Sequence, residues 1–188
     1  MLTAALCVGS LLSWFLPALW LDWQPALAWQ QPWRAWTSVW VHWSLLHLGA
    51  NLFAAVVVGA YGYSARMPVS ATLAWLAAWP LTQLGTLLLP HLSQGLLHYG
   101  GLSGMLHGGV AIVCAELLFK QQGARRWVGA AVSLGLVIKL VSEAPWGPVL
   151  RESADWDIAV VPLAHSSGAV AGLLCWLLLQ GAGALKGR

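Results

Sequence analysis

The sequence predicts an all-α polytopic membrane protein. Of its 188 residues, 59% are hydrophobic and only 8% are charged, and the mean hydropathy is +0.71. A water-soluble domain of this size could not cover so many apolar side chains with polar surface. Pro, Gly and charged residues divide long apolar runs, and these runs lack the period-2 alternation of a transmembrane barrel. We therefore expect helices that cross a bilayer.

The apolar runs predict where these helices lie. One helix needs about 20 apolar residues to cross a bilayer, so the chain has room for roughly six spans and no separate soluble domain. Backbone groups in lipid must be hydrogen-bonded within their own segment, which favours helices. The expected spans cover residues 2–21, 45–63, 69–90, 101–119, 127–144 and 161–180 of a single domain, residues 1–188.

The first run has a second interpretation. Residues 2–21 could be a signal peptide, because Ala26-Leu27-Ala28 follows them and small residues at alternate positions are typical of cleavage sites. Signal peptides carry a basic segment before the apolar run, and this run has none. The missing basic segment favours a membrane span over a signal peptide.

The basic residues predict the orientation of the helices. Short cytoplasmic loops of membrane proteins are rich in Lys and Arg. With an even number of spans between their loops, one side of the membrane receives Arg66, Lys120, Arg125, Arg126, Lys186 and Arg188. The loops of the other side carry mostly acidic residues. Both termini are therefore expected in the cytoplasm.

Tryptophan gathers in the first connection. Eight of the 14 Trp residues lie between Trp14 and Trp43. Because Trp prefers the interface between lipid and water, the segment from Asp22 to Ser44 is expected to lie in the outer leaflet. It could anchor the ends of the spans, or it could form a side wall that guards access to a site.

Two polar residues at the outer ends of spans predict chemistry. Ser103 lies in Gly101-Leu102-Ser103-Gly104, and His165 lies near the start of the last span. Polar groups are costly in a membrane and usually functional. A serine hydroxyl attacks a peptide carbonyl when a neighbouring base takes its proton. Ser103 is thus a candidate nucleophile and His165 a candidate base for proteolysis within the bilayer.

A third group could donate hydrogen bonds to the oxyanion that such an attack produces. His42, His47 and Asn51 lie at the outer end of the second span, and His47 and Asn51 share one helical face because they are four residues apart. They could instead link helices by hydrogen bonds. A single site explains all of these polar side chains more economically.

Taken in order, the motifs resemble the rhomboid family of intramembrane serine proteases. The matching strings are His42-x-x-x-x-His47-x-x-x-Asn51, Gly101-Leu102-Ser103-Gly104 and Ala164-His165-x-x-Gly168-x-x-x-Gly172, with Trp33-Arg34 in the first connection. The resemblance covers nearly the whole chain and implies a six-helix rhomboid-like bundle. It also implies that the enzyme needs no metal and no cofactor.

The resemblance further implies a role for each residue. Ser103 would be the nucleophile and His165 the base, without a carboxylate to orient it. His47, Asn51 and the Ser103 backbone N–H would hold the oxyanion, His42 would support a water-filled cavity, and Gly101 and Gly104 would support the site.

Glycines on the fourth and sixth spans predict how Ser103 and His165 could meet. Two small-xxx-small faces let helix backbones approach closely, and they are formed by Gly104 with Gly108 and by Gly168 with Gly172. If these faces meet, the nucleophile and base could lie within roughly 3 Å, the range for proton transfer. Generic membrane packing is the alternative.

His107 departs from the family pattern. It lies one turn after Ser103 on the same face, where many rhomboids carry an aromatic ring, often Tyr. An imidazole could stack on His165 there, or it could act as a rival base.

The remaining polar groups are expected to be structural. The pairs Lys139–Glu143 and Glu116–Lys120 are one turn apart and could neutralise each other. Cys7, Cys114 and Cys175 lie in apolar runs and are expected to be buried thiols. His91 and His98 are expected to be solvated, with no metal site. The net charge of +3 is explained by the cytoplasmic loops, so no nucleic-acid partner is indicated.

Within the rhomboids, the short chain, the Trp-rich first connection and His107 resemble the bacterial rhombosortases. This implies an inner-membrane enzyme whose site opens to the periplasm, and substrates that are single-span membrane proteins with a C-terminal Gly-Gly motif, an apolar helix and a basic tail. The alternatives are a catalytically inactive binding or chaperone relative and a small transporter, although the chain lacks the inverted repeats of transporters.

Overall fold

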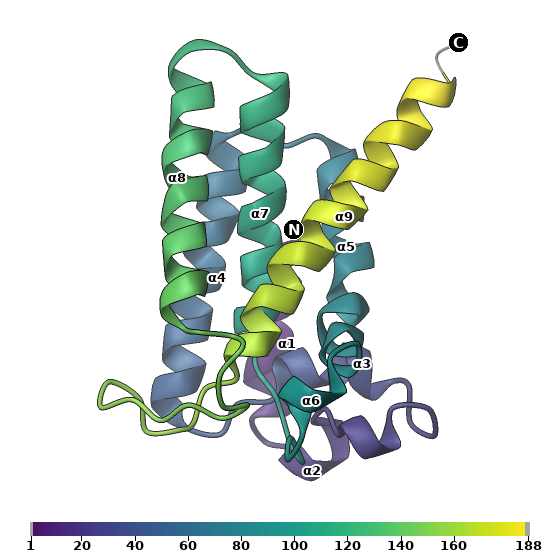
Figure 1. The fold of residues 1–188 in the computed structure, drawn as a ribbon, viewed down its shortest axis with the longest axis vertical. Helices are drawn as coiled ribbons and strands as arrows, with labels where there is room; N and C mark the ends of the chain where they lie inside the picture. The colour runs from purple at the N-terminus through teal and green to yellow at the C-terminus, as the bar shows by residue number, and fades with distance from the viewer. Residues whose placement is uncertain (1, 187–188) are drawn as a thin grey trace.

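Long helices that run in broadly similar directions make up the structure (Figure 1). The computed structural model describes the backbone of residues 2–186 and the side chains of residues 2–180. The long helices are α1 (Leu2–Ser13), α4 (Leu45–Ser64), α5 (Val69–Leu84), α7 (Ser103–Lys120), α8 (Gly123–Ser142) and α9 (Pro162–Lys186). Residues 2–186 form no strand, only two isolated β-bridges. The expected all-α class is confirmed.

Three of the described helices are long and apolar enough to cross a bilayer. They are α4, α7 and the Pro162–Gln180 part of α9, with mean hydropathies of 1.6, 1.2 and 1.5. α1 is apolar but shorter, and α8 carries Arg125, Arg126 and Lys139. Arg188 and the side chain of Lys186, which were expected on the cytoplasmic side, lie outside the described part of the chain.

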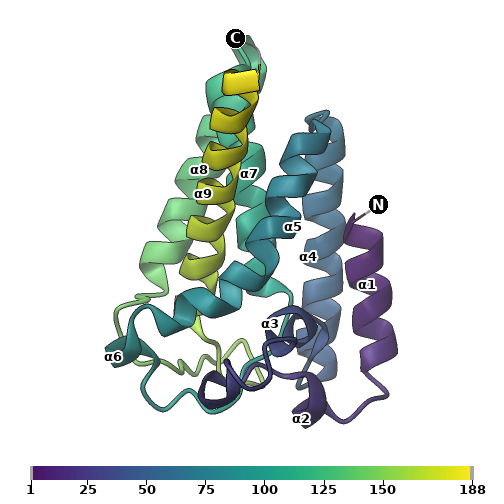
Figure 2. The same ribbon diagram turned by 90° about the vertical axis from the view of Figure 1, so that its right-hand side faces the viewer.

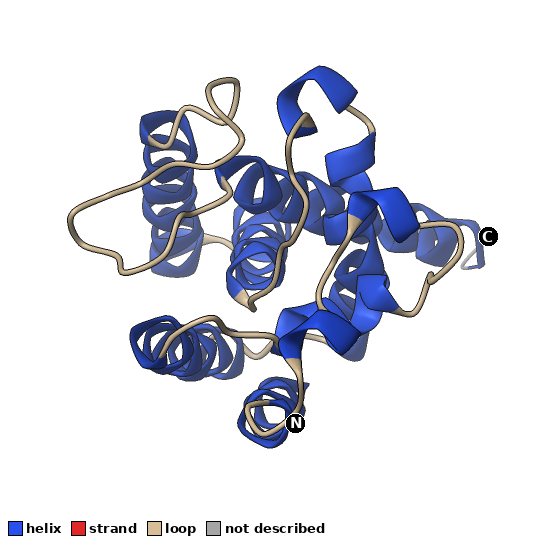
Figure 3. Ribbon diagram, turned by 90° about the horizontal axis from the view of Figure 1, so that it is seen from below, coloured by secondary structure: helices blue, strands red, loops and turns tan. Residues whose placement is uncertain are grey.

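Four helix ends that carry candidate residues lie at one end of the molecule. α7 is central and packs against α9, α8, α5 and α4, while α1 packs against α4. The long connections gather at the lower end in Figures 1 and 2, and the C-terminus lies at the opposite end. The view from below in Figure 3 looks along the helices with these connections in front. The starts of α4, α7 and α9 and the last turn of α8 therefore lie at the same end.

α7 and α9 touch through their backbones at the four glycines. A Cβ at Gly108 would lie 2.8 Å from the carbonyl oxygen of Gly168, and a Cβ at Gly104 would lie 2.9 Å from that of Ala164. A Cβ at Gly168 or Gly172 would overlap the main chain of Gly104 or Gly108. No side chain separates the helices here. We refer to Gly104, Gly108, Gly168 and Gly172 as the glycine seam.

The first apolar run is shorter and more divided than expected. The sequence predicts one span over residues 2–21, but α1 ends at Ser13 and a separate turn, α2 (Ala18–Leu21), follows Pro17. Proline lacks an N–H donor and disfavours a helical conformation in the residue before it. The Ser13 hydroxyl donates to the carbonyl oxygen of Trp40 at 2.6 Å. This contact ties the end of α1 to the first connection.

The run at 69–90 also ends early. α5 ends at Leu84 and is followed by the 3-10 turn η3 (Gly85–Leu87) and then by α6 (Pro90–Ser93). The first connection itself contains η1 (Pro25–Leu27), α3 (Arg34–Thr37) and η2 (Ser38–Trp40).

A buried ion pair and a β-bridge hold the first connection in place. Asp22 is fully buried, and its Oδ1 accepts from Nη1 of Arg34 at 2.8 Å. The next residue, Trp23, exchanges backbone hydrogen bonds of 2.7 and 2.9 Å with Tyr99. Because Tyr99 lies four residues before Ser103, these contacts fix the approach of the chain to α7.

Candidate active site

Ser103 and His165 are in hydrogen-bonding contact. Ser103 is the first residue of α7, and His165 lies in the first turn of α9. The Ser103 hydroxyl oxygen is 2.9 Å from Nε2 of His165. The imidazole is 5% exposed. The distance lies within the range for direct proton transfer, and the glycine seam permits the close approach of the two helices.

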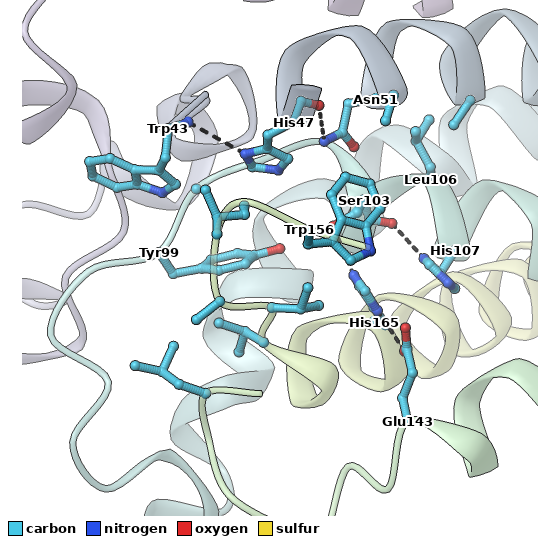
Figure 4. A pocket seen from close by; sticks show the side chains of 18 of the residues that line it. Trp43, His47, Asn51, Tyr99, Ser103, Leu106, His107, Glu143, Trp156 and His165 are labelled. Atoms are coloured by element: carbon cyan, nitrogen blue, oxygen red, sulfur yellow. Dashed lines mark hydrogen bonds and ion pairs between the residues drawn. The ribbon is translucent and has the colours of Figure 1, made fainter. Parts of the chain in front are cut away.

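Glu143 contacts the other nitrogen of His165, which differs from the expectation. The sequence resemblance implies that no carboxylate orients the base, yet Nδ1 of His165 lies 2.7 Å from Oε2 of Glu143 (Figure 4). Glu143 directly follows the last residue of α8. It also forms the expected ion pair with Lys139, so one carboxylate bridges two partners. The four-residue spacing predicts the pair with Lys139, but no sequence pattern predicts the contact of Glu143 with His165 of α9.

His107 lies flat against His165. The ring centroids are 4.4 Å apart and the ring planes differ by 13°. Nδ1 of His107 is 2.7 Å from the backbone carbonyl oxygen of Ser103. Because a carbonyl can only accept, this nitrogen carries the hydrogen. Of the two roles expected for His107, a stack on His165 or a rival base, the structure shows the stack.

His47 and Asn51 line the site from α4. Both are buried, and the Asn51 amide donates to the backbone carbonyl oxygen of His47 at 3.0 Å. Nδ1 of His47 lies 3.4 Å from the backbone nitrogen of Trp43 and accepts from it. The hydrogen of the His47 ring is then on Nε2, so this edge of the ring is a donor.

Glycine at position 101 makes room for the His47 ring. A Cβ there would lie 2.7 Å from Nε2 of His47, and the φ of Gly101 is +130°, a region that L side chains rarely adopt. Both the space and the backbone conformation require glycine. The turn that it allows leads into Ser103, which lines the same pocket as His47.

His42 lies behind His47 rather than at the hydroxyl of Ser103. The two rings have centroids 4.8 Å apart, and Nδ1 of His42 donates to the carbonyl oxygen of Trp40 at 3.0 Å. Burial lowers the pKa of His42 to about 4, so the ring is neutral at physiological pH. Its Nε2 is buried without a partner among the residues that the structure describes, which suits a bound water.

These side chains surround a pocket of about 300 Å³ (Figure 4). Its polar lining comprises Ser103, His165, His47 and Asn51, together with His98, Tyr99, His107, Lys139 and Glu143. The rest of the lining is largely apolar, and part of it comes from the connection between α8 and α9, including Leu150, Trp156 and Ile158. Asp157 of this connection accepts from the Ser44 hydroxyl at 2.7 Å. The pocket thus brings the hydroxyl of Ser103, the imidazole of His165 and the polar groups of His47 and Asn51 to one cavity.

Three side chains of the site could also approach a metal ion. His107, Glu143 and His165 offer donor atoms within 4.8 Å of one another. The Nδ1 atoms of both histidines are already engaged in hydrogen bonds of 2.7 Å. An ion bound through these Nδ1 atoms would have to replace both contacts, because a nitrogen that carries a hydrogen has no lone pair for a metal.

One protein-family model matches most of the chain. The family model of the Rhomboid domain matches residues 29–181. The chain belongs to the rhomboid family. Rhomboids are intramembrane serine proteases, so this rhomboid is a membrane protein of a protease family. The matched range contains every candidate site residue from His42 to Gly172. Among curated proteins, no sequence matches the chain significantly.

Other polar residues of the rhomboid chain pair differently from the expectations. Glu116 accepts from Trp176 Nε1 at 2.7 Å and binds across to α9, whereas a pair with Lys120 was expected. His98 is exposed, as expected, and its Nδ1 also donates to the buried Asp22 at 2.6 Å. Cys7, Cys114 and Cys175 are free thiols, of which Cys114 and Cys175 are buried.

Proposed function

We propose that this rhomboid hydrolyses peptide bonds, with Ser103 as nucleophile and His165 as general base. The observation that carries the proposal is the 2.9 Å contact between the Ser103 hydroxyl and Nε2 of His165 inside a pocket. As Ser103 Oγ attacks the carbonyl carbon, its proton passes to Nε2. The same proton then goes to the leaving amine, and an acyl-enzyme ester remains. Water resolves the ester by the same proton route.

The oxyanion is stabilised by donors from two helices. His47 and Asn51 of α4 and the backbone N–H of Ser103 are the proposed donors. The Nε2 edge of His47 adjoins Gly101, and one N–H of Asn51 is left after its bond to the His47 carbonyl. Such preorganised donors contribute strongly to the rate of acyl transfer.

We further propose one rhomboid-like domain over residues 1–188 with six spans, namely α1, α4, α5, α7, α8 and α9. The termini lie in the cytoplasm of an inner membrane, and the site opens to the periplasm. The distribution of basic residues supports this orientation. The clustering of Ser103, His165 and His47 at the end opposite the C-terminus supports it as well.

The proposed substrates are single-span membrane proteins with a C-terminal Gly-Gly motif, an apolar helix and a basic tail, as in rhombosortases. The pocket of about 300 Å³, with many apolar lining residues, has room for a short unwound segment of small residues around the cleaved bond. Glycine also lowers the cost of unwinding a helix to expose that bond.

Labelling of the purified protein with a fluorophosphonate probe tests the proposal. The wild type should be labelled, and Ser103→Ala should not. Ser153→Ala is the matched control, because this serine lies exposed in the connection between α8 and α9, and it should be labelled like the wild type. Labelling that survives in Ser103→Ala would overturn the assignment of the nucleophile.

Co-expression with Gly-Gly-tailed membrane proteins tests the substrate class. The wild type should trim the tail, and the Ser103→Ala form should leave it intact. Equal processing of the partner by both forms would instead point to a catalytically inactive binding protein. Cleavage of membrane proteins without the tail, but not of tailed ones, would assign a general rhomboid specificity.

A further inference from the structure

The carboxylate of Glu143 bridges a base and a cation at the edge of the pocket. Its Oε2 lies 2.7 Å from Nδ1 of His165, and its Oε1 contacts Nζ of Lys139. The Glu143 side chain is 15% exposed, whereas that of Lys139 is 54% exposed. The carboxylate is thus largely buried where it meets His165. Its other oxygen is paired with the exposed ammonium group of Lys139.

We propose that Glu143 is a positioning residue that extends Ser103 and His165 to a hydrogen-bonded triad of serine, histidine and glutamate. The inference rests on the proposed proteolytic function and deepens it. It departs from the dyad that the family resemblance implies. The observation that carries it is the position of a carboxylate at the nitrogen of His165 that does not face Ser103.

The carboxylate selects the tautomer of His165. An ionised carboxylate can only accept hydrogen bonds, so Nδ1 of His165 carries the hydrogen and donates it to Glu143. Nε2 then has a free lone pair and accepts from the hydroxyl of Ser103. This is the only neutral tautomer in which His165 can take the proton of Ser103.

The carboxylate also stabilises the charge that the reaction creates. When Nε2 takes the proton, His165 becomes an imidazolium with Glu143 in direct contact. Lys139 keeps the carboxylate ionised and paired when His165 is neutral, so no uncompensated anion is left in the pocket. The other ionisable side chains that line the pocket are His107 from α7, His47 from α4, and His98 and Tyr99 before α7.

The end of α8 is shaped to hold Glu143 in this place. Ala144 adopts a φ of +49°, which ends the helix directly after Glu143. The guanidinium of Arg151 donates to the carbonyl oxygen of Ser142 at 2.8 Å, and Arg151 pairs with Val160 through backbone hydrogen bonds. The connection therefore folds back onto the last turn of α8 and fixes the backbone that carries the carboxylate.

Three variants test the proposal by the rate of fluorophosphonate labelling across pH. Glu143→Gln keeps the shape but removes the charge and can donate to Nδ1, which favours the wrong tautomer. We expect a loss of about 10²- to 10⁴-fold, as at the equivalent aspartate of a serine protease triad. Glu143→Asp should recover part of the rate. Glu152 is an exposed carboxylate on the same connection, so Glu152→Gln is the control and should match the wild type.

The pH profile separates a positioning role from a merely structural one. Without the carboxylate, the protonated form of His165 loses its partner while Lys139 stays nearby. The acidic limb of the labelling profile should therefore move to lower pH in Glu143→Gln, by about one unit or more. Nitrogen NMR of His165 in the Ser103→Ala background gives a readout that needs no activity, with Nδ1 protonated when Glu143 is present and the other tautomer in Glu143→Gln.

The outcomes distinguish this inference from the proposed function. If Glu143→Gln keeps the rate, the pH profile and the His165 tautomer of the wild type while Ser103→Ala is unlabelled, then the triad is wrong and the dyad stands. If the wild type shows no labelling that depends on Ser103, the proposed function fails and the triad fails with it. A lower rate with an unshifted profile and an unchanged tautomer would also overturn the positioning role.

Discussion

His107 stacks on His165 with ring planes only 13° apart and ring centroids separated by 4.4 Å. The two rings come from α7 and α9, so the stack spans the crossing of the helices that carry the candidate nucleophile and base. The Nδ1 hydrogen of His107 is bound to the carbonyl oxygen of Ser103, which turns its ring face, not a lone pair, toward His165. This arrangement makes His107 a support for the base.

A flat apolar ring should therefore replace His107 with little loss. We expect His107→Phe to keep the labelling rate within about 10-fold of the wild type, because the stack contributes only about 0.5–1.5 kcal/mol beyond burial. His107→Ala removes the ring and should be slower and less stable. Labelling kinetics and thermal unfolding in detergent measure both. If His107 were the base, the Phe variant would be as inactive as Ser103→Ala.

A methyl group in the glycine seam should separate Ser103 from His165. In Gly168→Ala, the new Cβ overlaps the carbonyl oxygen of Gly104, so α7 and α9 must move apart at a cost of about 1–3 kcal/mol. The melting temperature should fall, and labelling should drop at least about 10-fold as the contact for proton transfer lengthens.

Gly135→Ala is the matched control for the seam. Position 135 lies in α8, and a Cβ there meets nothing within 4 Å. Because alanine loses less backbone entropy in a helix, the change should be neutral or stabilising by up to about 1 kcal/mol. Equal melting temperatures for the two variants would refute the account of the seam.

Loss of the Asp22 charge should destabilise the first connection. Asp22 is fully buried against Arg34 and His98, and Asp22→Asn leaves the buried guanidinium without its counter-charge. Breaking a buried pair from one side costs about 3–5 kcal/mol. Thermal unfolding of Asp22→Asn against Asp155→Asn, an exposed site, measures the effect. Equal stabilities would mean that water replaces the carboxylate at no cost.

Removal of one oxyanion donor should slow the chemistry more than binding. Asn51→Ala should lower kcat by about 10²- to 10³-fold, as loss of a single donor does in other serine proteases, with a much smaller change in KM. A peptide or tailed-protein cleavage assay separates the two constants. A change confined to KM would assign Asn51 to the contact between helices instead.

Burial of His42 predicts a loss of stability in acid. The unfolded ring has its ordinary pKa of 6.5, whereas burial lowers the folded pKa to about 4. The unfolded state therefore binds the extra proton first. The free energy of unfolding should fall as the pH drops from 6.5 toward 4, by at most about 1.4 kcal/mol per pH unit for this one group. Above pH 6.5 the contribution is constant.

Replacement of His42 by asparagine checks this prediction. His42→Asn cannot take up the proton, so its unfolding free energy should decline less steeply over the same interval. The same substitution at His91, which is exposed, is the control and should keep the wild-type slope. Parallel declines for wild type and His42→Asn would locate the acid sensitivity elsewhere.

Features that depend on spacing within one helix could be predicted from the sequence. The apolar runs predict the all-α class, and the Lys139–Glu143 spacing predicts an ion pair that the structure contains. The first run alone misleads, because Pro17 divides residues 2–21 and proline lacks the N–H that continues a helix.

Contacts between distant segments were not accessible from spacing. Glu143 and His165 are separated by 22 positions, and Asp22 and His98 by 76. Nothing in the local pattern distinguishes a carboxylate paired within its own turn from one that also reaches another helix. Glu116 illustrates the same limit, since its partner is Trp176 of α9 and not Lys120 one turn away.

The glycine seam has a further consequence for how the protein responds to its surroundings. Side chains change rotamers with temperature and with the lipid around them, but at the glycine seam the approach of α7 and α9 is limited by main-chain atoms. A change in bilayer thickness can therefore tilt both helices together without stretching the gap between hydroxyl and imidazole. The outer connections, which hold Trp156 and Asp157, have no such restraint, and changes of lipid should alter access to the pocket before they alter its reactive atoms.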